Sequence, residues 1–177
     1  MTRFFALVPA AGVGERSGAG MPKQYVEIAG KPMLAHTLAT LAAVPRLAQT
    51  LVVLSPADDR FEAALPAHTG WIARVGGASR AESVLGGLAE LRRRGASDDD
   101  WVLVHDAARC LLQPAWVDAL IDACEHDEVG GLLAQPIALD PATLEDPQWK
   151  PLTPGVRVLP RPGRVEQLEF PVIVTSE

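Results

Sequence analysis

Short β-rich runs alternate with segments of helical apolar spacing over the first 140 residues, and this alternation constrains the fold more than any other feature of the chain. The expected strands comprise residues 4–8, 50–54, 72–75, 101–105 and 131–137. Such alternation is typical of parallel strands joined by crossover helices. We therefore expect an α/β fold with a Rossmann-like, mostly parallel sheet and helices on both faces.

Three segments between these strands place apolar residues three or four positions apart, which is the spacing of one face of a helix. The three sets are Leu34, Leu38, Leu41 and Ala42; Ala81, Val84, Leu85, Leu88 and Leu91; and Val117, Leu120, Ile121 and Cys124. We interpret all three sets as helix faces that pack on the sheet.

The residues after Asp140 are rich in proline, with seven of the 15 prolines in the last 37 positions. Proline inside a helix removes a hydrogen bond and clashes with the preceding turn, so this part is expected to form loops. Short edge strands are expected at residues 156–159 and 171–175. The chain is thus expected to be one domain, with an α/β core at residues 1–140 and a proline-rich, atypical tail at residues 141–177.

The composition excludes several classes of protein. An apolar fraction of 48% is sufficient for a globular core, and 16 basic against 22 acidic side chains give a formal charge of −6. This balance favours neither nucleic acid nor an anionic membrane as a partner. The chain has two cysteines, Cys110 and Cys124, and no secretory leader or membrane-spanning apolar run. We expect a cytoplasmic protein with reduced thiols.

A glycine-rich segment follows the first expected strand, with Pro-Ala-Ala-Gly-Val-Gly-Glu-Arg at residues 9–16 and Pro-Lys-Gln-Tyr at residues 22–25. Small residues let backbone N–H groups approach a phosphate, and Arg16 and Lys23 supply cations, so these residues indicate a triphosphate cradle. A dinucleotide fingerprint would need glycine in place of Ser17, and a Walker loop would need Ser or Thr in place of Gln24. A glycine-rich turn with two solvated cations is the alternative.

The fourth expected strand ends in Val-His-Asp-Ala-Ala-Arg at residues 104–109. Ligands of open parallel sheets bind beyond the carboxyl ends of the strands, so Asp106 and Arg109 are expected to face the same crevice as the glycine-rich segment. A carboxylate there suits Mg²⁺, and an arginine suits a second anionic group. An ion pair between Asp106 and Arg109 is the alternative, and His105 is interpreted as structural.

The third expected strand leads into Gly-Gly-Ala-Ser-Arg-Ala-Glu-Ser at residues 76–83. Paired glycines expose backbone groups that can read the edge of a base, with Ser83 as a further polar contact. Ser79 and Glu82 also have the spacing of a capping box at the start of a helix, and both interpretations can hold. With the phosphate cradle, this segment indicates that residues 1–140 are a nucleotide-binding core.

Together these motifs resemble the 2-C-methyl-D-erythritol 4-phosphate cytidylyltransferase family over about residues 4–137. The resemblance implies a nucleotidyltransferase-type fold and transfer of CMP from CTP to 2-C-methyl-D-erythritol 4-phosphate, with release of pyrophosphate, in non-mevalonate isoprenoid biosynthesis. It also implies that Arg16 and Lys23 are catalytic and that Asp106 binds Mg²⁺. The nucleotide-binding residues that it implies are Ala10, Ala11, Gly12, Gly77, Ser83 and Asp106.

The resemblance further implies that Arg109 binds the acceptor substrate, and that Thr143 does so after a shift of register. The sequence after Asp140 departs from the family pattern, and the arm through which the family dimerises has no counterpart there. The resemblance still implies a homodimer. Two alternatives stay open because the acceptor half differs: transfer to ribitol 5-phosphate, and a CTP-binding module without catalysis.

Overall fold

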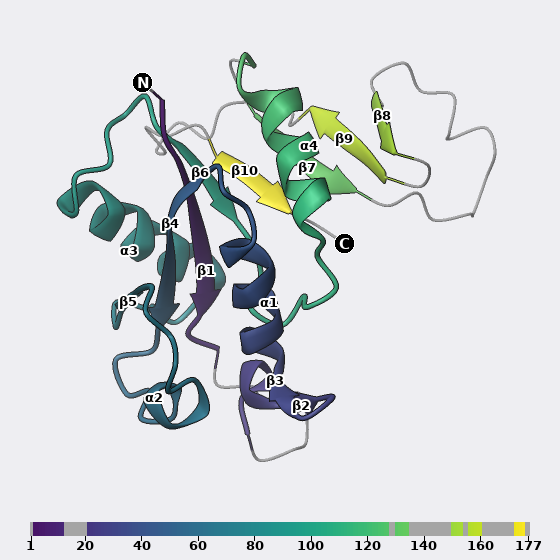
Figure 1. Ribbon diagram of the computed structural model, residues 1–177. Helices are drawn as coiled ribbons and strands as arrows, with labels where there is room; N and C mark the ends of the chain where they lie inside the picture. The colour runs from purple at the N-terminus through teal and green to yellow at the C-terminus, as the bar shows by residue number, and fades with distance from the viewer. Residues whose placement is uncertain are drawn as a thin grey trace.

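An eight-stranded sheet organises the part of the chain that the structure describes (Figure 1). The structure is a computed structural model that describes residues 2–12, 21–127, 130–134, 150–153, 156–160 and 172–175. The strands of this sheet are β1 (Phe4–Ala10), β4 (Leu47–Leu54), β5 (Trp71–Ala73), β6 (Trp101–Val104), β7 (Gly131–Ala134), β8 (Lys150–Thr153), β9 (Val156–Pro160) and β10 (Val172–Thr175). A separate small hairpin pairs β2 (Glu27–Ile28) with β3 (Lys31–Pro32).

The strand order is β5-β4-β1-β6-β10-β7-β9-β8. Neighbours from β5 to β7 are parallel, and β9 and β8 continue the sheet in antiparallel fashion. The expected mostly parallel sheet is therefore confirmed. The ends of the expected strands fall within three residues of those observed, except that residues 135–137 lie outside the described residues.

Helices cover both faces of the sheet, as expected (Figure 1). They are α1 (Met33–Ala42), α3 (Arg80–Arg93) and α4 (Pro114–Cys124), with the short α2 (Phe61–Ala64) and the 3-10 turn η2 (Lys23–Tyr25) in the connections. Successive strand residues point to opposite faces, so Val8 packs in the cluster that holds α1 and α4, whereas Leu7 packs in the cluster that holds α3. Among the described residues no helix is long and apolar enough to cross a bilayer.

Most residues of the three predicted helix faces are buried, but Ala42, Ala81 and Leu85 are exposed, and the prediction was wrong for these three. The buried face of α3 includes Gly87 instead, because this position lies between those of the buried residues Ser83 and Leu91 around the helix. A Cβ at Gly87 would come within 2.6 Å of Leu7 and 2.7 Å of Val53. Glycine there lets α3 approach the sheet closely.

The proline-rich tail forms strands at both predicted positions, β9 and β10, so the prediction of strands at residues 156–159 and 171–175 is confirmed. Their predicted edge position was wrong, because the edge on this side of the sheet is formed by β8. β9 lies between β7 and β8, and β10 lies between β6 and β7. Prolines led to the edge prediction, whereas the uninterrupted run Val-Ile-Val-Thr of β10 is typical of an interior parallel strand.

A buried carboxylate joins the start of β6 to the chain before β1. Asp100 is 1% exposed and accepts hydrogen bonds from the backbone N–H of Arg3 at 2.9 Å, from its guanidinium at 2.6 Å and from the backbone N–H of Ser97 at 2.8 Å. Burial raises the pKa of Asp100, but these hydrogen bonds outweigh burial and lower the pKa to about 2. The ionised carboxylate therefore stabilises the pairing of β1 with β6.

We expect the Asp100→Asn variant to lose about 2 to 3 kcal/mol of unfolding free energy at pH 7, measured by urea denaturation. Because the folded-state pKa lies below the unfolded value of 3.8, the contribution of Asp100 is complete above about pH 4 and is lost as the pH falls toward 2. The difference between wild type and variant is therefore expected to shrink over that range. The exposed neighbour Asp99, changed to Asn, is the control, and an equal loss in both variants would contradict the assignment.

Candidate functional site

The loops that follow β1 and β5 touch each other at the carboxyl edge of the sheet. The backbone N–H of Gly76 donates to the carbonyl of Leu54, the last residue of β4, at 2.9 Å. A Cβ at Gly76 would come within 2.2 Å of the Cβ of Ala11 and 2.7 Å of the Leu54 carbonyl oxygen. Glycine is therefore needed at position 76 for the predicted base-reading loop to lie against the predicted phosphate cradle.

A glutamine side chain holds the start of the glycine-rich segment in shape. The Gln24 amide nitrogen donates to the carbonyl of Ala10 at 2.8 Å and to the carbonyl of Gly12 at 3.1 Å. Only 6% of Gln24 is exposed, and its two N–H groups meet two acceptors. Since these two carbonyl groups are fixed from the inside, the backbone from Ala10 to Gly12 has a defined course.

The neighbours of Gln24 show why Lys23 projects outward. Tyr25 is buried, and its hydroxyl donates to Asp58 at 2.7 Å. Burial, together with this hydrogen bond, raises the pKa of Tyr25, so the hydroxyl keeps its proton. With Gln24 and Tyr25 anchored, the side chain of Lys23 at the start of η2 is exposed. Lys23 thus adjoins the residue that holds the glycine-rich segment.

Asp106 follows β6 and lies between two arginines. Its Oδ1 accepts a hydrogen bond from Nε of Arg80 at 2.8 Å, and its Oδ2 lies 2.9 Å from Nε of Arg109. The predicted ion pair between Asp106 and Arg109 is therefore present, and Arg80 adds a partner from α3. Nε2 of buried His105 lies 2.9 Å from the carbonyl oxygen of Arg109 and supports the turn formed by residues 105–109. This contact agrees with the interpretation of His105 as a structural residue. Burial lowers the pKa of His105.

Ser79 caps the start of α3 as predicted, whereas Glu82 accepts from the residue before the cap and not from Ser79 itself. The Ser79 hydroxyl accepts from the backbone N–H of Glu82 at 3.1 Å, and the Glu82 carboxylate accepts from the backbone N–H of Ala78 at 2.6 Å. Buried Ser83 accepts from the backbone N–H of Gly77 at 3.2 Å and donates to the Ser79 carbonyl at 2.9 Å. Both polar contacts of the Ser83 hydroxyl thus shape the loop that was predicted to read the base.

Hydrogen bonds and packing link the segments that hold the described members of the predicted site at the carboxyl ends of β1, β5 and β6. These members are Ala10, Ala11, Gly12, Lys23, Gly77, Ser83, Asp106 and Arg109. The remaining two, Arg16 and Thr143, lie outside the described residues. Sequence reasoning missed Gln24 and Arg80 as parts of this arrangement. Both residues lie within motifs that the sequence analysis singled out, Gln24 in Pro-Lys-Gln-Tyr and Arg80 three residues after the paired glycines, but no role was assigned to either.

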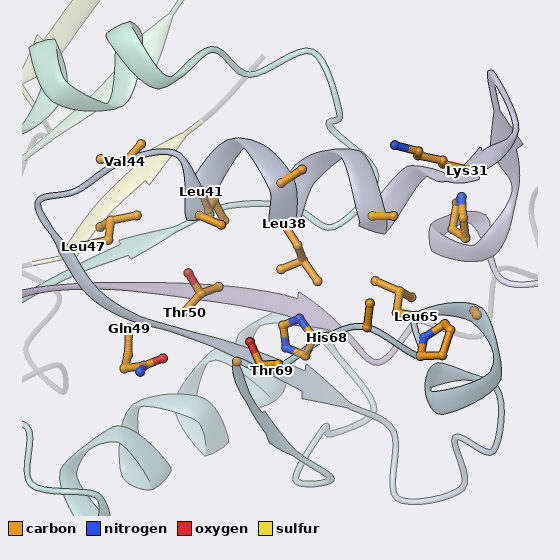
Figure 2. Close-up of a pocket in the computed structure, with 18 of the residues that line it drawn as sticks. Lys31, Leu38, Leu41, Val44, Leu47, Gln49, Thr50, Leu65, His68 and Thr69 are labelled. Carbon is orange, nitrogen blue, oxygen red and sulfur yellow. The ribbon is translucent and has the colours of Figure 1, made fainter.

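A cavity of about 680 Å³ lies apart from these residues, between α1, β4 and the loop before β5 (Figure 2). Its labelled lining residues include Leu38, Leu41, Leu65 and His68. Burial lowers the pKa of His68, and its Nε2 has no hydrogen-bond partner within the described part of the chain. None of the described site residues lines this cavity.

Comparison with known proteins agrees with the geometry. Residues 4–146 match the family described as "IspD: 2-C-methyl-D-erythritol 4-phosphate cytidylyltransferase". The protein of that name from Laribacter hongkongensis is 58% identical over 141 residues, which cover 78% of this chain and 60% of the relative. The one from Nitrosospira multiformis is 48% identical over 172 residues, which cover 92% of this chain and 70% of the relative.

A solved structure shares the fold. The crystal structure of a 4-diphosphocytidyl-2C-methyl-D-erythritol synthase superposes with a TM-score of 0.66 and 33% identity, over 78% of this chain and 61% of that one. The nucleotidyltransferase type of the fold is thereby confirmed. This chain spans 60% of the length of the Laribacter relative. From the four motifs, the sheet and these matches, we conclude that the chain belongs to the 2-C-methyl-D-erythritol 4-phosphate cytidylyltransferase family.

Proposed function

We propose that this protein is a CTP-dependent cytidylyltransferase that transfers CMP to 2-C-methyl-D-erythritol 4-phosphate and releases pyrophosphate. The observation that supports this most directly is the contact of three motif-bearing loops at one sheet edge, in a member of the corresponding family. Ligands of open α/β sheets bind at this edge. Ala10, Ala11 and Gly12 would line the nucleotide, and Gly77 and the loop that Ser83 shapes would contact the cytosine.

The proposed reaction is an in-line displacement at the α-phosphorus of CTP. A phosphate oxygen of the acceptor forms a bond to this phosphorus, while the bond from the phosphorus to the bridging oxygen breaks and pyrophosphate leaves. Two polyanions must approach each other, so catalysis consists mainly of positioning and charge neutralisation. Lys23 and Arg16 would supply positive charge at the triphosphate, and no side chain needs to become a nucleophile.

Mg²⁺ fits the chemistry of the carboxylate at the end of β6. Within the described ranges no three His, Cys, Asp or Glu side chains form a cluster that could hold a metal ion by themselves. Mg²⁺ at nucleotide sites is typically bound by one or two carboxylates together with phosphate oxygens and water, and Asp106 matches this requirement. When bound, the ion would neutralise phosphate charge. Asp106 would hold it, with no other described carboxylate required.

The acceptor side of the proposal involves Arg109 and Thr143. The Arg109 side chain is 35% exposed beside Asp106, where a planar guanidinium suits a phosphate monoester. Thr143 and assembly as a homodimer are included on the basis of family resemblance alone. Cytoplasmic location is likewise part of the proposal.

The proposal is tested by pyrophosphate release from CTP and Mg²⁺ with 2-C-methyl-D-erythritol 4-phosphate, compared with ribitol 5-phosphate. Turnover with the first acceptor is the expected result. Turnover with ribitol 5-phosphate but not with 2-C-methyl-D-erythritol 4-phosphate would show that the proposed acceptor is wrong and that ribitol 5-phosphate is the acceptor. If calorimetry shows that CTP binds but neither acceptor supports turnover, the protein is a nucleotide-binding module without catalysis.

We expect Lys23→Ala and Arg16→Ala each to lower kcat by about 10²- to 10³-fold, the usual effect of removing one group that stabilises transition-state charge. Steady-state pyrophosphate release measures the loss. Lys31→Ala is the matched control, because Lys31 is an exposed lysine on the neighbouring hairpin and lies outside the predicted site. Near-normal turnover of Lys23→Ala would contradict its catalytic role.

We expect Gln24→Glu to raise the Kd for CTP about tenfold or more, because a carboxylate does not donate, so the hydrogen bonds to the carbonyls of Ala10 and Gly12 are lost. Isothermal calorimetry measures the Kd, and thermal unfolding is expected to shift downward in parallel. Gln49→Glu makes the same change at an exposed position of β4 and serves as control. A Kd unchanged from wild type would show that the glycine-rich segment does not depend on Gln24.

A further inference from the structure

The ion cluster around Asp106 joins two elements that are distant in the sequence. Arg80 is the first residue of α3, which packs on β1 and β4, whereas Asp106 follows β6. Because β6 is the neighbour of β1 and the N–H of His105 donates to the carbonyl of Leu7, the contact between Arg80 and Asp106 lies beside the carboxyl end of β1. The glycine-rich segment begins at that end. A nucleotide bound along this segment would therefore meet the Arg80–Asp106 pair.

The two arginines differ in how firmly they are held beside Asp106. Arg109 lies on the same turn, which is closed by a hydrogen bond from the Arg109 N–H to the Asp106 carbonyl at 3.1 Å and by the contact of His105 with the Arg109 carbonyl. Arg80 belongs to a different element, and its side chain is 48% exposed. Water screens such exposed ion pairs, so they contribute little to stability. Arg80 is therefore the partner that can leave Asp106 for a stronger anion.

The charges favour such an exchange. Two guanidinium groups face one carboxylate, so the cluster has an excess of one positive charge. A triphosphate offers more negative charge and more acceptor oxygens than a carboxylate, and guanidinium groups bind phosphate oxygens well. While both carboxylate oxygens of Asp106 contact arginines, the neighbouring positive charges also oppose the approach of a divalent cation.

We propose, on the basis of the proposed function, that Arg80 couples metal binding to nucleotide binding at this site. In nucleotide-free protein Arg80 binds Asp106 and weakens its affinity for a divalent cation. When a nucleoside triphosphate binds over the end of β1, the Arg80 guanidinium moves onto the phosphates. One oxygen of Asp106 then becomes available to the cation that accompanies the nucleotide. Arg80 is thus both a triphosphate ligand and a positioning residue for the metal.

The test exploits two affinities that are expected to change in opposite directions in Arg80→Gln, which removes the charge and keeps a polar side chain. The Kd for CTP, measured by calorimetry in EDTA, is expected to rise about 10-fold or more, the usual effect of losing one charge-assisted hydrogen bond. The affinity for Mn²⁺ alone is measured by electron paramagnetic resonance on nucleotide-free protein. The Kd for Mn²⁺ is expected to be about threefold or more lower in Arg80→Gln than in wild type. Asp106→Asn should abolish this Mn²⁺ binding.

Two control variants separate this role from a loss of structure or a general charge effect. Arg93→Gln removes the same charge near the other end of α3, where Arg93 pairs with Glu90, and is expected to change neither affinity. Arg80→Lys retains the charge and is expected to retain most of the CTP affinity and the weak Mn²⁺ binding of wild type. A variant that had lost its fold would lose both ligands together.

The outcomes distinguish this inference from the proposed function. If wild type binds CTP and Arg80→Gln binds it equally well, the coupling role of Arg80 is wrong, while the proposed function stands. Mn²⁺ binding to Arg80→Gln that is unchanged or weaker than to wild type also overturns the coupling. A wild-type protein that does not bind CTP overturns the proposed function and this inference with it.

Discussion

The pairing of β1 with a parallel strand on each side is the constraint on which the site depends. Leu7 and Val8 are fully buried, and Ala10, the last residue of β1, is 3% exposed. Leu7 lies opposite Val104 of β6, so both strands end at the same edge of the sheet and Asp106 emerges beside the glycine-rich segment. The loops therefore meet because buried strands fix where each loop begins.

Buried neutral groups and exposed charged groups have different tasks at this edge. Gln24, Ser83 and His105 are buried and direct their hydrogen bonds to backbone groups of the surrounding turns. Lys23 and Arg80 are exposed, with charges that face solvent or a screened partner. A chain with a formal charge of −6 can thus expose positively charged side chains at the site. The buried amides and hydroxyls shape the loops in advance, which reduces the ordering that ligand binding has to cause.

The sheet, its covering helices and the three motif-bearing loops could be predicted from the sequence because their signals are local: apolar periodicity, glycines at turns and the ends of strands. The roles of Gln24 and Arg80 could not, since the partners of Gln24 lie 12 and 14 residues away and that of Arg80 lies 26 away. A single polar residue has no period that indicates its tertiary contact. β10 was misplaced for a related reason: local proline content says nothing about which gap in a sheet a strand enters.

The position of β10 has a consequence for the order in which the sheet can be completed. Because β10 lies between β6 and β7, those two strands have no direct pairing with each other, and each leaves a row of backbone groups unpaired until residues 172–175 arrive. During synthesis on the ribosome, the middle of the sheet therefore stays open while more than thirty residues after β7 emerge. Any chaperone or neighbouring nascent chain that offers an extended segment competes for this gap during that interval.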